Sequence, residues 1–325
     1  MEMEKRYDVT ALGELLIDFT ENGLSSQGNP LLEANPGGAP CNVLAMLQKL
    51  GRKTSFIGKV GDDQFGKMLK EAIESTGIDS GNLVFDGEIH TTLAFVHTFP
   101  DGDRDFSFYR NPGADVMLRK EEVQKERIEA SRIFHFGSLS FTHKESREAA
   151  CFAIQTAKEA GVLVSFDPNL REPLWKSLED AKAAIAYGME QCDVLKISDN
   201  EVVFMTGEED YDRGVSLLQE TYGIPLIFLT MGKDGSRAYY KGRKIEAAPF
   251  PQENTIETTG AGDTFTGCIL NELLDTGMEN LTDEALVQMM TFANAAAALI
   301  TTRRGALKVM PERAEVMKVL EKKEK

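Results

Sequence analysis

The strongest constraint on the fold is a regular alternation of strand-like and helix-like segments that begins near residue 130. Short apolar runs predict strands at 132–136, 162–166, 193–197 and 225–230, and amphipathic runs predict helices at 144–160, 176–191, 200–206 and 212–222. Short apolar, β-branched runs between amphipathic helices indicate parallel strands that are buried on both faces. Because such strands are joined by right-handed crossovers, the sequence predicts an α/β fold with a doubly wound, mostly parallel central sheet flanked by helices.

Polar loops follow three of these strands. They read DPNLR at 167–171, SDNE at 198–201 and MGKDG at 231–235. In open parallel sheets, ligands bind beyond the carboxyl ends of the strands. An ordinary surface loop would explain any one of these segments, but three in succession favour a ligand cleft at this edge.

The first third of the chain has a different pattern. A strand is expected at 9–13 and a helix at 41–50, whereas the segments 14–34 and 88–112 carry alternating residues such as TLAFVHTF and RDFSFYR. These two segments predict an antiparallel β patch set apart from the main sheet. Inserted into a single domain that spans residues 1–325, they could form a lid over the cleft.

A glycine-rich turn near the C-terminus carries the clearest chemical signal. It reads ETTGAGD from Glu257 to Asp263, and the apolar residues that follow it recur every four positions, as in a helix. The N–H groups of Gly260, Ala261 and Gly262 would converge at the start of this helix. Unpaired amides and the helix dipole favour an anion there, and a phosphoryl group is the natural guest. Asp263 would face the same point, although a lone motif of this kind could also be a turn with a capping aspartate.

Two further glycine motifs lie near the N-terminus. The sequence PGGAPCN at 36–42 leads into the helix expected at 41–50. Its paired glycines would let a small polar ligand approach the backbone, and Asn42 offers both a donor and an acceptor to hydroxyl groups. The sequence GDDQFG at 61–66 is expected to be structural, as a turn that caps a helix at 67–76.

Composition excludes several classes of function. The net charge of −16 makes nucleic acid an unexpected partner. No apolar run approaches the length of about 18 residues that spans a membrane, and the charged opening MEMEKRYD is unlike a secretory signal, so a cytoplasmic protein is expected. A dinucleotide dehydrogenase is disfavoured, because a GxGxxG motif should follow the first strand and Gly13 is followed instead by Glu14, Leu15 and Leu16.

Together these motifs resemble those of the ribokinase-like (PfkB) family of carbohydrate kinases. PGGAPCN with GKVGDDQFG is similar to the N-terminal signature of the family, and ETTGAGD to its C-terminal signature, which usually reads DTTGAGD. Similar motifs run nearly end to end, namely GELLIDF (13–19), RDFSFYRNPGAD (104–115), FHFGSLS (134–140), FDPNLR (166–171), TMGKDGS (230–236) and FANAAAALITTRRGAL (292–307). The resemblance implies a ribokinase-like fold with a small β-sheet lid, and an enzyme that uses ATP and Mg²⁺.

The resemblance also implies roles for individual residues. Asp263 corresponds to the catalytic base, and the amides of Gly260, Ala261 and Gly262 to the group that holds the transferring phosphoryl charge. The positions that match sugar-binding residues are Asp18, Gly37, Gly38, Asn42, Phe108, Arg110 and Arg171. The positions that match nucleotide contacts are Ser198, Thr230, Gly232, Gly235, Gly260, Gly262 and Asn294.

Two metal positions follow from the same resemblance, and each involves a departure from the family pattern. Glu201 matches the last position of an NxxE motif that orders Mg²⁺ through water, but Ser198 replaces its asparagine. A hydroxyl can still hydrogen-bond water or phosphate. Glu257 replaces the usual aspartate beside a monovalent cation, so its side chain is one methylene longer. Whether K⁺ is bound is therefore left open.

The choice of sugar rests on the same resemblance. GGAPCN, FYRNPGAD, GSLSF and DPNLR are most similar to the corresponding segments of the family's fructokinases. The expected reaction is phosphorylation of D-fructose at O6, and the alternative is a kinase for 2-keto-3-deoxygluconate or another sugar. A silent nucleotide or sugar sensor on the same fold is disfavoured, because Asp263 and the glycine-rich turn are intact. A homodimer through the unpaired edges of the lid is also expected.

Overall fold

The computed structural model describes residues 5–98, 104–250, 252 and 254–323. Its strands are β1 (Tyr7–Leu12), β2 (Leu16–Leu24), β3 (Pro30–Gly37), β4 (Thr54–Gly61), β5 (Asp79–Asp86), β6 (Leu93–Thr98), β7 (Arg104–Tyr109), β8 (Ser131–Gly137), β9 (Leu163–Asp167), β10 (Val194–Ser198), β11 (Leu226–Thr230), β12 (Ser236–Tyr240) and β13 (Arg243–Ala247). Its α-helices are α1 (Ala39–Lys49), α2 (Gln64–Ser75), α3 (Lys125–Glu129), α4 (Lys144–Glu159), α5 (Leu178–Gln191), α6 (Asp199–Thr206), α7 (Tyr211–Tyr222), α8 (Ala261–Thr276), α9 (Asp283–Ile300) and α10 (Arg313–Lys323).

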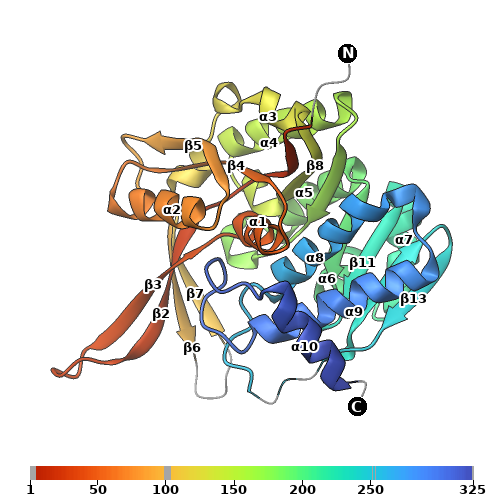
Figure 1. The fold of residues 1–325 in the computed structure, drawn as a ribbon. Helices are drawn as coiled ribbons and strands as arrows, with labels where there is room; N and C mark the ends of the chain where they lie inside the picture. Colours follow the sequence, from red (N-terminus) through yellow and green to blue (C-terminus); the bar gives the residue numbers. More distant parts are fainter. Residues whose placement is uncertain (1–4, 99–103, 251, 253, 324–325) are drawn as a thin grey trace.

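A large sheet forms the centre of the molecule, with the strand order β13-β12-β11-β10-β9-β8-β1-β4-β5 (Figure 1). The pairings from β11 through to β5 are all parallel. This confirms the predicted sheet, and β8, β9, β10 and β11 coincide with the predicted strands to within two residues. The pairs β11–β12 and β12–β13 are antiparallel and extend one edge. No prediction covered those two strands.

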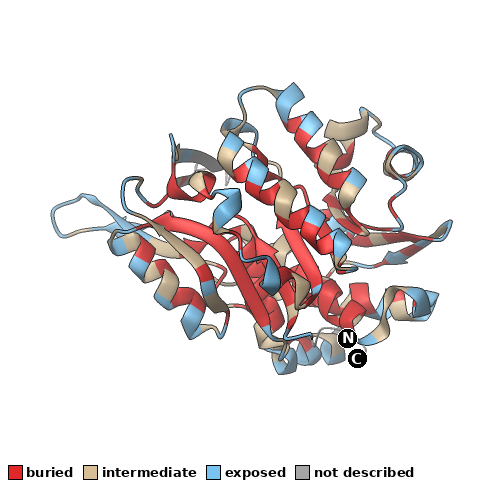
Figure 2. Cartoon of the chain, turned by 90° about the horizontal axis from the view of Figure 1, so that it is seen from above, coloured by how far each residue is buried: buried red, intermediate tan, exposed pale blue. Residues whose placement is uncertain are grey.

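Helices cover both faces of the large sheet, as the doubly wound prediction requires. Apolar residues of α1, α2, α8, α9 and α10 share one buried cluster with one face, and those of α3 to α7 share a second cluster with the other. Figure 2 shows the buried strands between helices whose outer sides are exposed. The chain therefore folds around two apolar layers separated by the sheet.

The segments predicted to stand apart form a second, four-stranded sheet with the order β3-β2-β6-β7, called the small sheet below. Its two hairpins are antiparallel, as expected, but the pair that joins them, β2–β6, is parallel. Strand β2 follows β1, and β6 follows β5. Since β1 and β5 run in the same direction in the large sheet, β2 and β6 both leave its carboxyl edge along the same course (Figure 1).

The predicted cap at 61–66 is confirmed. Asp63 is the N-cap residue of α2, and its side chain accepts a hydrogen bond of 2.8 Å from the Gly66 amide. The same carboxylate accepts bonds of 2.9 and 2.8 Å from the amide and hydroxyl of Thr91, just before β6. This aspartate therefore ties α2 to the entry of the small sheet.

Candidate active site

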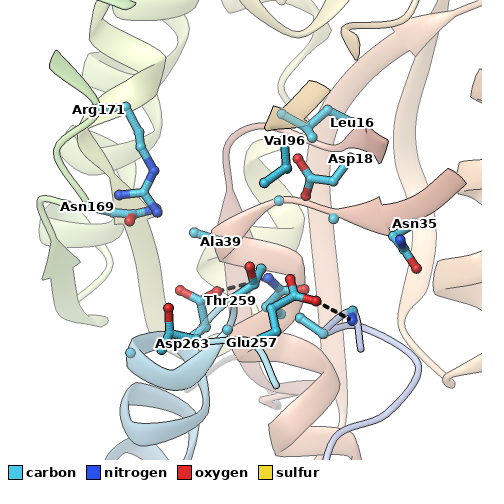
Figure 3. Close-up of a pocket in the computed structure, with 18 of the residues that line it drawn as sticks. Leu16, Asp18, Asn35, Ala39, Val96, Asn169, Arg171, Glu257, Thr259 and Asp263 are labelled. Atoms are coloured by element: carbon cyan, nitrogen blue, oxygen red, sulfur yellow. Dashed lines mark hydrogen bonds between the residues drawn. The ribbon is translucent and has the colours of Figure 1, made fainter. Parts of the chain in front are cut away.

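A cavity of about 860 Å³ lies at the carboxyl edge of the large sheet, beside the small sheet. Its wall is drawn from β2, β3 and the start of α1, from the segments after β9 and β10, and from the turn before α8. In Figure 3, Asp18, Leu16 and Val96 lie on one side of the cavity and Arg171 and Asn169 on the other, with Asp263 and Glu257 at one end.

Most residues singled out from the sequence meet in this one cavity. Those that line it are Asp18, Gly37, Gly38, Asn42, Phe108, Arg171, Ser198, Glu201, Thr230, Glu257, Gly260, Gly262 and Asp263. Ala261 lies among them as the first residue of α8. Residues separated by more than 200 positions thus face one space, because the strand ends and the small sheet converge on the same edge.

Arg110 is not among the lining residues of this cavity. Its guanidinium forms an ion pair of 2.6 Å with Asp115 and donates hydrogen bonds to the Thr142 hydroxyl at 3.0 Å and the Leu139 carbonyl at 3.2 Å. Only 4% of the Arg110 side chain is exposed. The structure therefore places this arginine inside the protein, where it fixes neighbouring segments.

Three predicted nucleotide contacts lie beside the cavity lining, in one neighbourhood past the end of β11. Gly232 and Gly235 both have positive φ angles, of 52° and 90°, in the turn that follows β11. The amide of Asn294 donates to the carbonyls of Ala247 at 3.4 Å and Ala248 at 3.1 Å, and Ala247 also abuts Gly235. This group adjoins Thr230, which does line the cavity.

The glycine-rich turn leads into the N-terminus of α8. Gly260 adopts a left-handed φ of 79°, and a Cβ atom there would come within 2.7 Å of Ala306. The Ala261 amide makes a long turn contact of 3.3 Å to the Thr258 carbonyl. Positive helix-end charge and closely packed backbone create a site suited to an anion, and Asp263 lies in the first turn of the same helix.

Asp263 is partly buried, and another predicted residue orients it. The Asn42 side-chain amide donates a hydrogen bond of 2.8 Å to Oδ2 of Asp263. Burial raises the pKa of Asp263 to about 6, with the Asn42 hydrogen bond opposing the shift and the Asp167 carboxylate adding to it. The helix terminus alone would favour the charged form, so desolvation outweighs the helix dipole here. Asp263 is thereby a stronger base than a solvated aspartate, yet remains mainly ionised at pH 7.

A second group of carboxylates lies toward the small sheet. Burial raises the pKa of Asp18 to about 7; the Arg171 charge opposes this shift and the Glu257, Glu14 and Asp263 carboxylates reinforce it. Burial likewise raises the pKa of Glu14 to about 7, although the Ala39 amide donates to its carboxylate at 2.8 Å. Sequence reasoning missed Glu14. Its one signal was a charged residue within the apolar run LGELLI.

Lys196 also lines the cavity and was not singled out from the sequence. It lies in β10, within a run that was interpreted only as a strand, and forms an ion pair of 3.1 Å with Asp167. A lysine in an otherwise buried apolar strand was the available signal. With Arg171, it gives a largely acidic cavity two positive side chains.

Glu201 fits the role of a carboxylate that holds a metal through water. Its Oε1 accepts from the Leu170 amide at 2.8 Å, and its Oε2 accepts from the amide and hydroxyl of Ser198 at 2.9 Å each. Because each oxygen already has a protein donor, the remaining lone pairs suit metal-bound water better than direct coordination. Among the described residues, no group of three or more His, Cys, Asp or Glu side chains could hold a metal ion by itself.

Comparison with known proteins identifies relatives over almost the whole chain. The family model described as "pfkB family carbohydrate kinase" matches residues 7–313. Among curated proteins, the probable fructokinase-2 of Arabidopsis thaliana is 40% identical over 315 residues, which cover 96% of this chain and 95% of that protein. The similarity therefore extends far beyond the signature motifs.

Solved structures of fructokinases also superpose on this chain. A fructokinase with bound ATP from Xylella fastidiosa superposes with a TM-score of 0.89 at 30% identity, covering 99% of this chain and 100% of that one. A fructokinase from Vibrio cholerae O395 in a fructose-, ADP- and calcium-bound form has a TM-score of 0.86 at 28% identity, covering 98% and 100%. Within the described part of the chain, no helix has the length and hydropathy needed to cross a membrane.

Proposed function

Because the chain belongs to the pfkB family of carbohydrate kinases, we propose that it transfers the γ-phosphoryl group of ATP to O6 of D-fructose. It is an ATP-dependent sugar kinase. The observation that carries the proposal is the position of a partly buried carboxylate, Asp263, in the first turn of α8, next to the glycine-rich turn and in the cavity lining. Fructose is favoured because fructokinases recur among the relatives in both sequence and structure.

In this reaction, the sugar hydroxyl donates its hydrogen bond to Asp263 while its oxygen approaches the γ-phosphorus. The new P–O bond forms as the bond from phosphorus to the β,γ-bridging oxygen breaks, which releases ADP. The hydroxyl proton passes to the Asp263 carboxylate. A loose transition state makes the hydroxyl acidic only late in the transfer, so an aspartate with a pKa of about 6 is an adequate acceptor. The amides of Gly260, Ala261 and Gly262 stabilise the charge on the phosphoryl oxygens.

Sugar recognition falls to the opposite side of the cavity. We assign the sugar hydroxyls to Asp18, to the backbone at Gly37 and Gly38, and to Arg171, with Phe108 contributing apolar contact. Asn42 takes part by orienting Asp263. The small sheet would act as a lid that excludes water. Arg110 supports this side indirectly, through its pair with Asp115.

The nucleotide is assigned to the edge of the sheet that runs from β10 to β11. Ser198 and Thr230 line the cavity, and Gly232, Gly235 and Asn294 extend the same edge. Mg²⁺ would be held through water by Glu201 and would neutralise charge on the ATP phosphates. The calcium ion in the Vibrio cholerae fructokinase structure supports a divalent metal.

Substrate choice is the first test. In a coupled assay of ADP release with Mg-ATP, we expect D-fructose to give the highest kcat/KM in a panel that also contains 2-keto-3-deoxygluconate, ribose and adenosine. We expect fructose because the similar proteins are fructokinases, one of them in a fructose-bound form. A clear preference for another sugar would overturn the fructose assignment and leave the kinase intact, and the position of the phosphate on the product is read by NMR.

Dependence on a monovalent cation is the second test. The Glu257 carboxylate is buried in the cavity wall, where it accepts a 3.2 Å hydrogen bond from the Gly305 amide, and it has no ion-pair partner among the described residues. A cation beside it would offset the cost of a buried charge. We propose that K⁺ binds there and raises kcat over a choline background of equal ionic strength. Equal rates in the two salts would show that this position does not use a cation.

Two broader properties complete the proposal. The small sheet exposes large apolar side chains at Leu24, Leu31, Leu32 and Tyr109. Exposed apolar side chains on a sheet with open edges favour association, and we propose a homodimer through this surface. We also assign the protein to the cytoplasm, on the charge and composition described above.

A further inference from the structure

Lys196 is an ammonium group held inside the large sheet but open to the cavity. It is the third of the five residues of β10, and its side chain is 11% exposed. Its Nζ lies 3.1 and 3.3 Å from the two carboxylate oxygens of Asp167. Asp167 also accepts a hydrogen bond of 3.2 Å from the Asn169 amide, and the Thr266 hydroxyl, which donates to the Gly262 carbonyl at 2.9 Å, lies 3.4 Å from it. The Lys196 ammonium is therefore held by a carboxylate, Asp167, that the neighbouring backbone also fixes.

The chain offers a direct comparison in Lys59 of β4, a second buried lysine. Its side chain is 3% exposed, and its Nζ contacts Asp86 at 3.0 Å, Glu122 at 3.0 Å and the Met117 carbonyl at 3.2 Å. An ammonium has three N–H donors, and three separate protein groups accept them in this case. Lys196 bonds only one carboxylate among the described residues, so it retains donor capacity on the side that faces the cavity.

The Lys196 ammonium lies next to one particular element of the cavity wall, the glycine-rich turn. A Cβ atom built on Gly262 would lie 3.0 Å from the Lys196 Nζ, so the ammonium is adjacent to the anion-binding turn of α8. Burial works against the charged form of Lys196, but the carboxylates of Asp167, Glu201 and Asp263 outweigh it and raise its pKa. Lys196 therefore stays positive, in the field of both the carboxylate assigned to the metal water and the proposed base.

We propose that Lys196 is a catalytic residue that contacts the γ-phosphoryl group and stabilises its charge during transfer. This proposal rests on the kinase reaction set out above. In that reaction, the phosphoryl group passes from the β,γ-bridging oxygen to the sugar hydroxyl next to Asp263 and the turn. Lys196 donates hydrogen bonds to the phosphoryl oxygens without gaining or losing a proton. It adds a full positive charge to the partial charges of the backbone amides.

The alternative is that the Lys196–Asp167 pair only supports the fold. Buried ion pairs contribute little net stability, because desolvation offsets their attraction, whereas removing one partner strands a buried charge. A support role therefore predicts that the harm done by losing Lys196 disappears when Asp167 is neutralised as well. A catalytic role predicts that stability recovers and turnover does not.

The test uses three variants of the full chain, with wild type assayed on the sugar panel first. We expect Lys196→Met to lower kcat about 10²–10³-fold, the usual loss for one preorganised charge-stabilising group. The affinity for ADP, which lacks the γ-phosphoryl, should stay within about threefold by calorimetry. The double variant Asp167→Asn with Lys196→Met should regain melting temperature and keep the low kcat. Lys59→Met is the control for loss of a buried, paired lysine outside the cavity, and should lower Tm while kcat is retained.

The outcomes separate the proposals. A double variant that recovers both Tm and kcat would make Lys196 a structural residue, and so would a folded Lys196→Met enzyme with wild-type kcat. If Lys196→Met does not fold, the double variant alone decides, since it removes the charge pair as a unit. A wild-type protein inactive on every sugar would instead remove the proposed kinase reaction, and the role of Lys196 with it.

Discussion

Asp263→Asn should leave a folded protein that turns over about 10²–10⁴-fold more slowly, the range expected for removing a positioned acid or base. Asparagine keeps the size of the side chain and can still accept the Asn42 hydrogen bond, but cannot take the hydroxyl proton. ATP affinity should remain within a few-fold of wild type, because the turn amides are untouched. kcat and Tm are to be measured on the same preparation.

The pH dependence gives a second readout of the same carboxylate. The pKa of Asp263 is raised to about 6, and its ionised form is the one that accepts the proton. The kcat/KM of the wild type should therefore rise with pH between about 5 and 7 and level off above. Asp18 lies close enough to influence this titration, so the apparent pKa values belong to the interacting carboxylates together.

A control distinguishes catalysis from helix capping. Thr282 is the N-cap residue of α9, where its hydroxyl accepts from the Ala285 amide at 3.1 Å. Thr282→Ala should cost about 1 kcal/mol of stability and leave kcat unchanged. If Asp263→Asn behaves in the same way, with a lowered Tm and near-normal turnover, Asp263 is a cap and not the base.

Asp18→Asn should lower kcat/KM for the sugar about 10- to 100-fold at pH 8 and hardly change KM for ATP. A charged acceptor makes hydrogen bonds worth about 1.5–3 kcal/mol, against about 0.5–1.5 kcal/mol for a neutral one. If two sugar hydroxyls each bond a neutral amide in place of a carboxylate, the summed loss of hydrogen-bond free energy corresponds to the expected 10- to 100-fold fall in kcat/KM. Glu21→Gln on the same strand is the matched control, since it removes an exposed carboxylate.

The same substitution should stabilise the ligand-free protein. The folded pKa of Asp18 is about 7, above the ordinary value of 3.8, so the folded state holds this proton more tightly than the unfolded state does. Wild-type stability therefore falls as pH rises from about 4 to 7, and asparagine avoids that loss. Tm of Asp18→Asn should exceed that of wild type at pH 8 and match it near pH 4. A lower Tm at both pH values would show that Asp18 has a structural role.

The elements of the α/β core could be predicted because each has a local signature. Apolar runs mark β8 to β11, and the helices between them begin and end within two residues of their expected bounds. The strands β12 and β13 were missed, because their residues SRAYY and RKIEA mix charged and apolar side chains at an edge of the sheet. The glycine-rich turn and its aspartate were also found, since backbone conformation is encoded locally.

Contacts between distant residues could not be predicted. The bond from Asn42 to Asp263 and the ion pair of Lys196 with Asp167 depend on how strands are ordered in the sheet. Arg110 shows the same limit, because a cation five residues before Asp115 gives no sign that the two will pair in the interior. The raised pKa of Asp263 is a desolvation effect, which exists only once the cavity is assembled.

Several chain connections of the small sheet lie along one side, and Phe19 and Asn22 add contacts with Phe65 of α2 and with Arg304. Strand β2 follows β1 after three residues, β3 runs into α1 after Gly38, and β6 arrives from β5 through the Thr91 contact with Asp63. A sheet connected to the core along one side can move as a unit by hinge motion about these connections. Asp18 lies on β2 of the small sheet, whereas Asn42 and Asp263 lie on α1 and α8, outside it. A movement of the small sheet would therefore change the distance from Asp18 to Asp263, while the hydrogen bond between Asn42 and Asp263, the proposed base, stays intact.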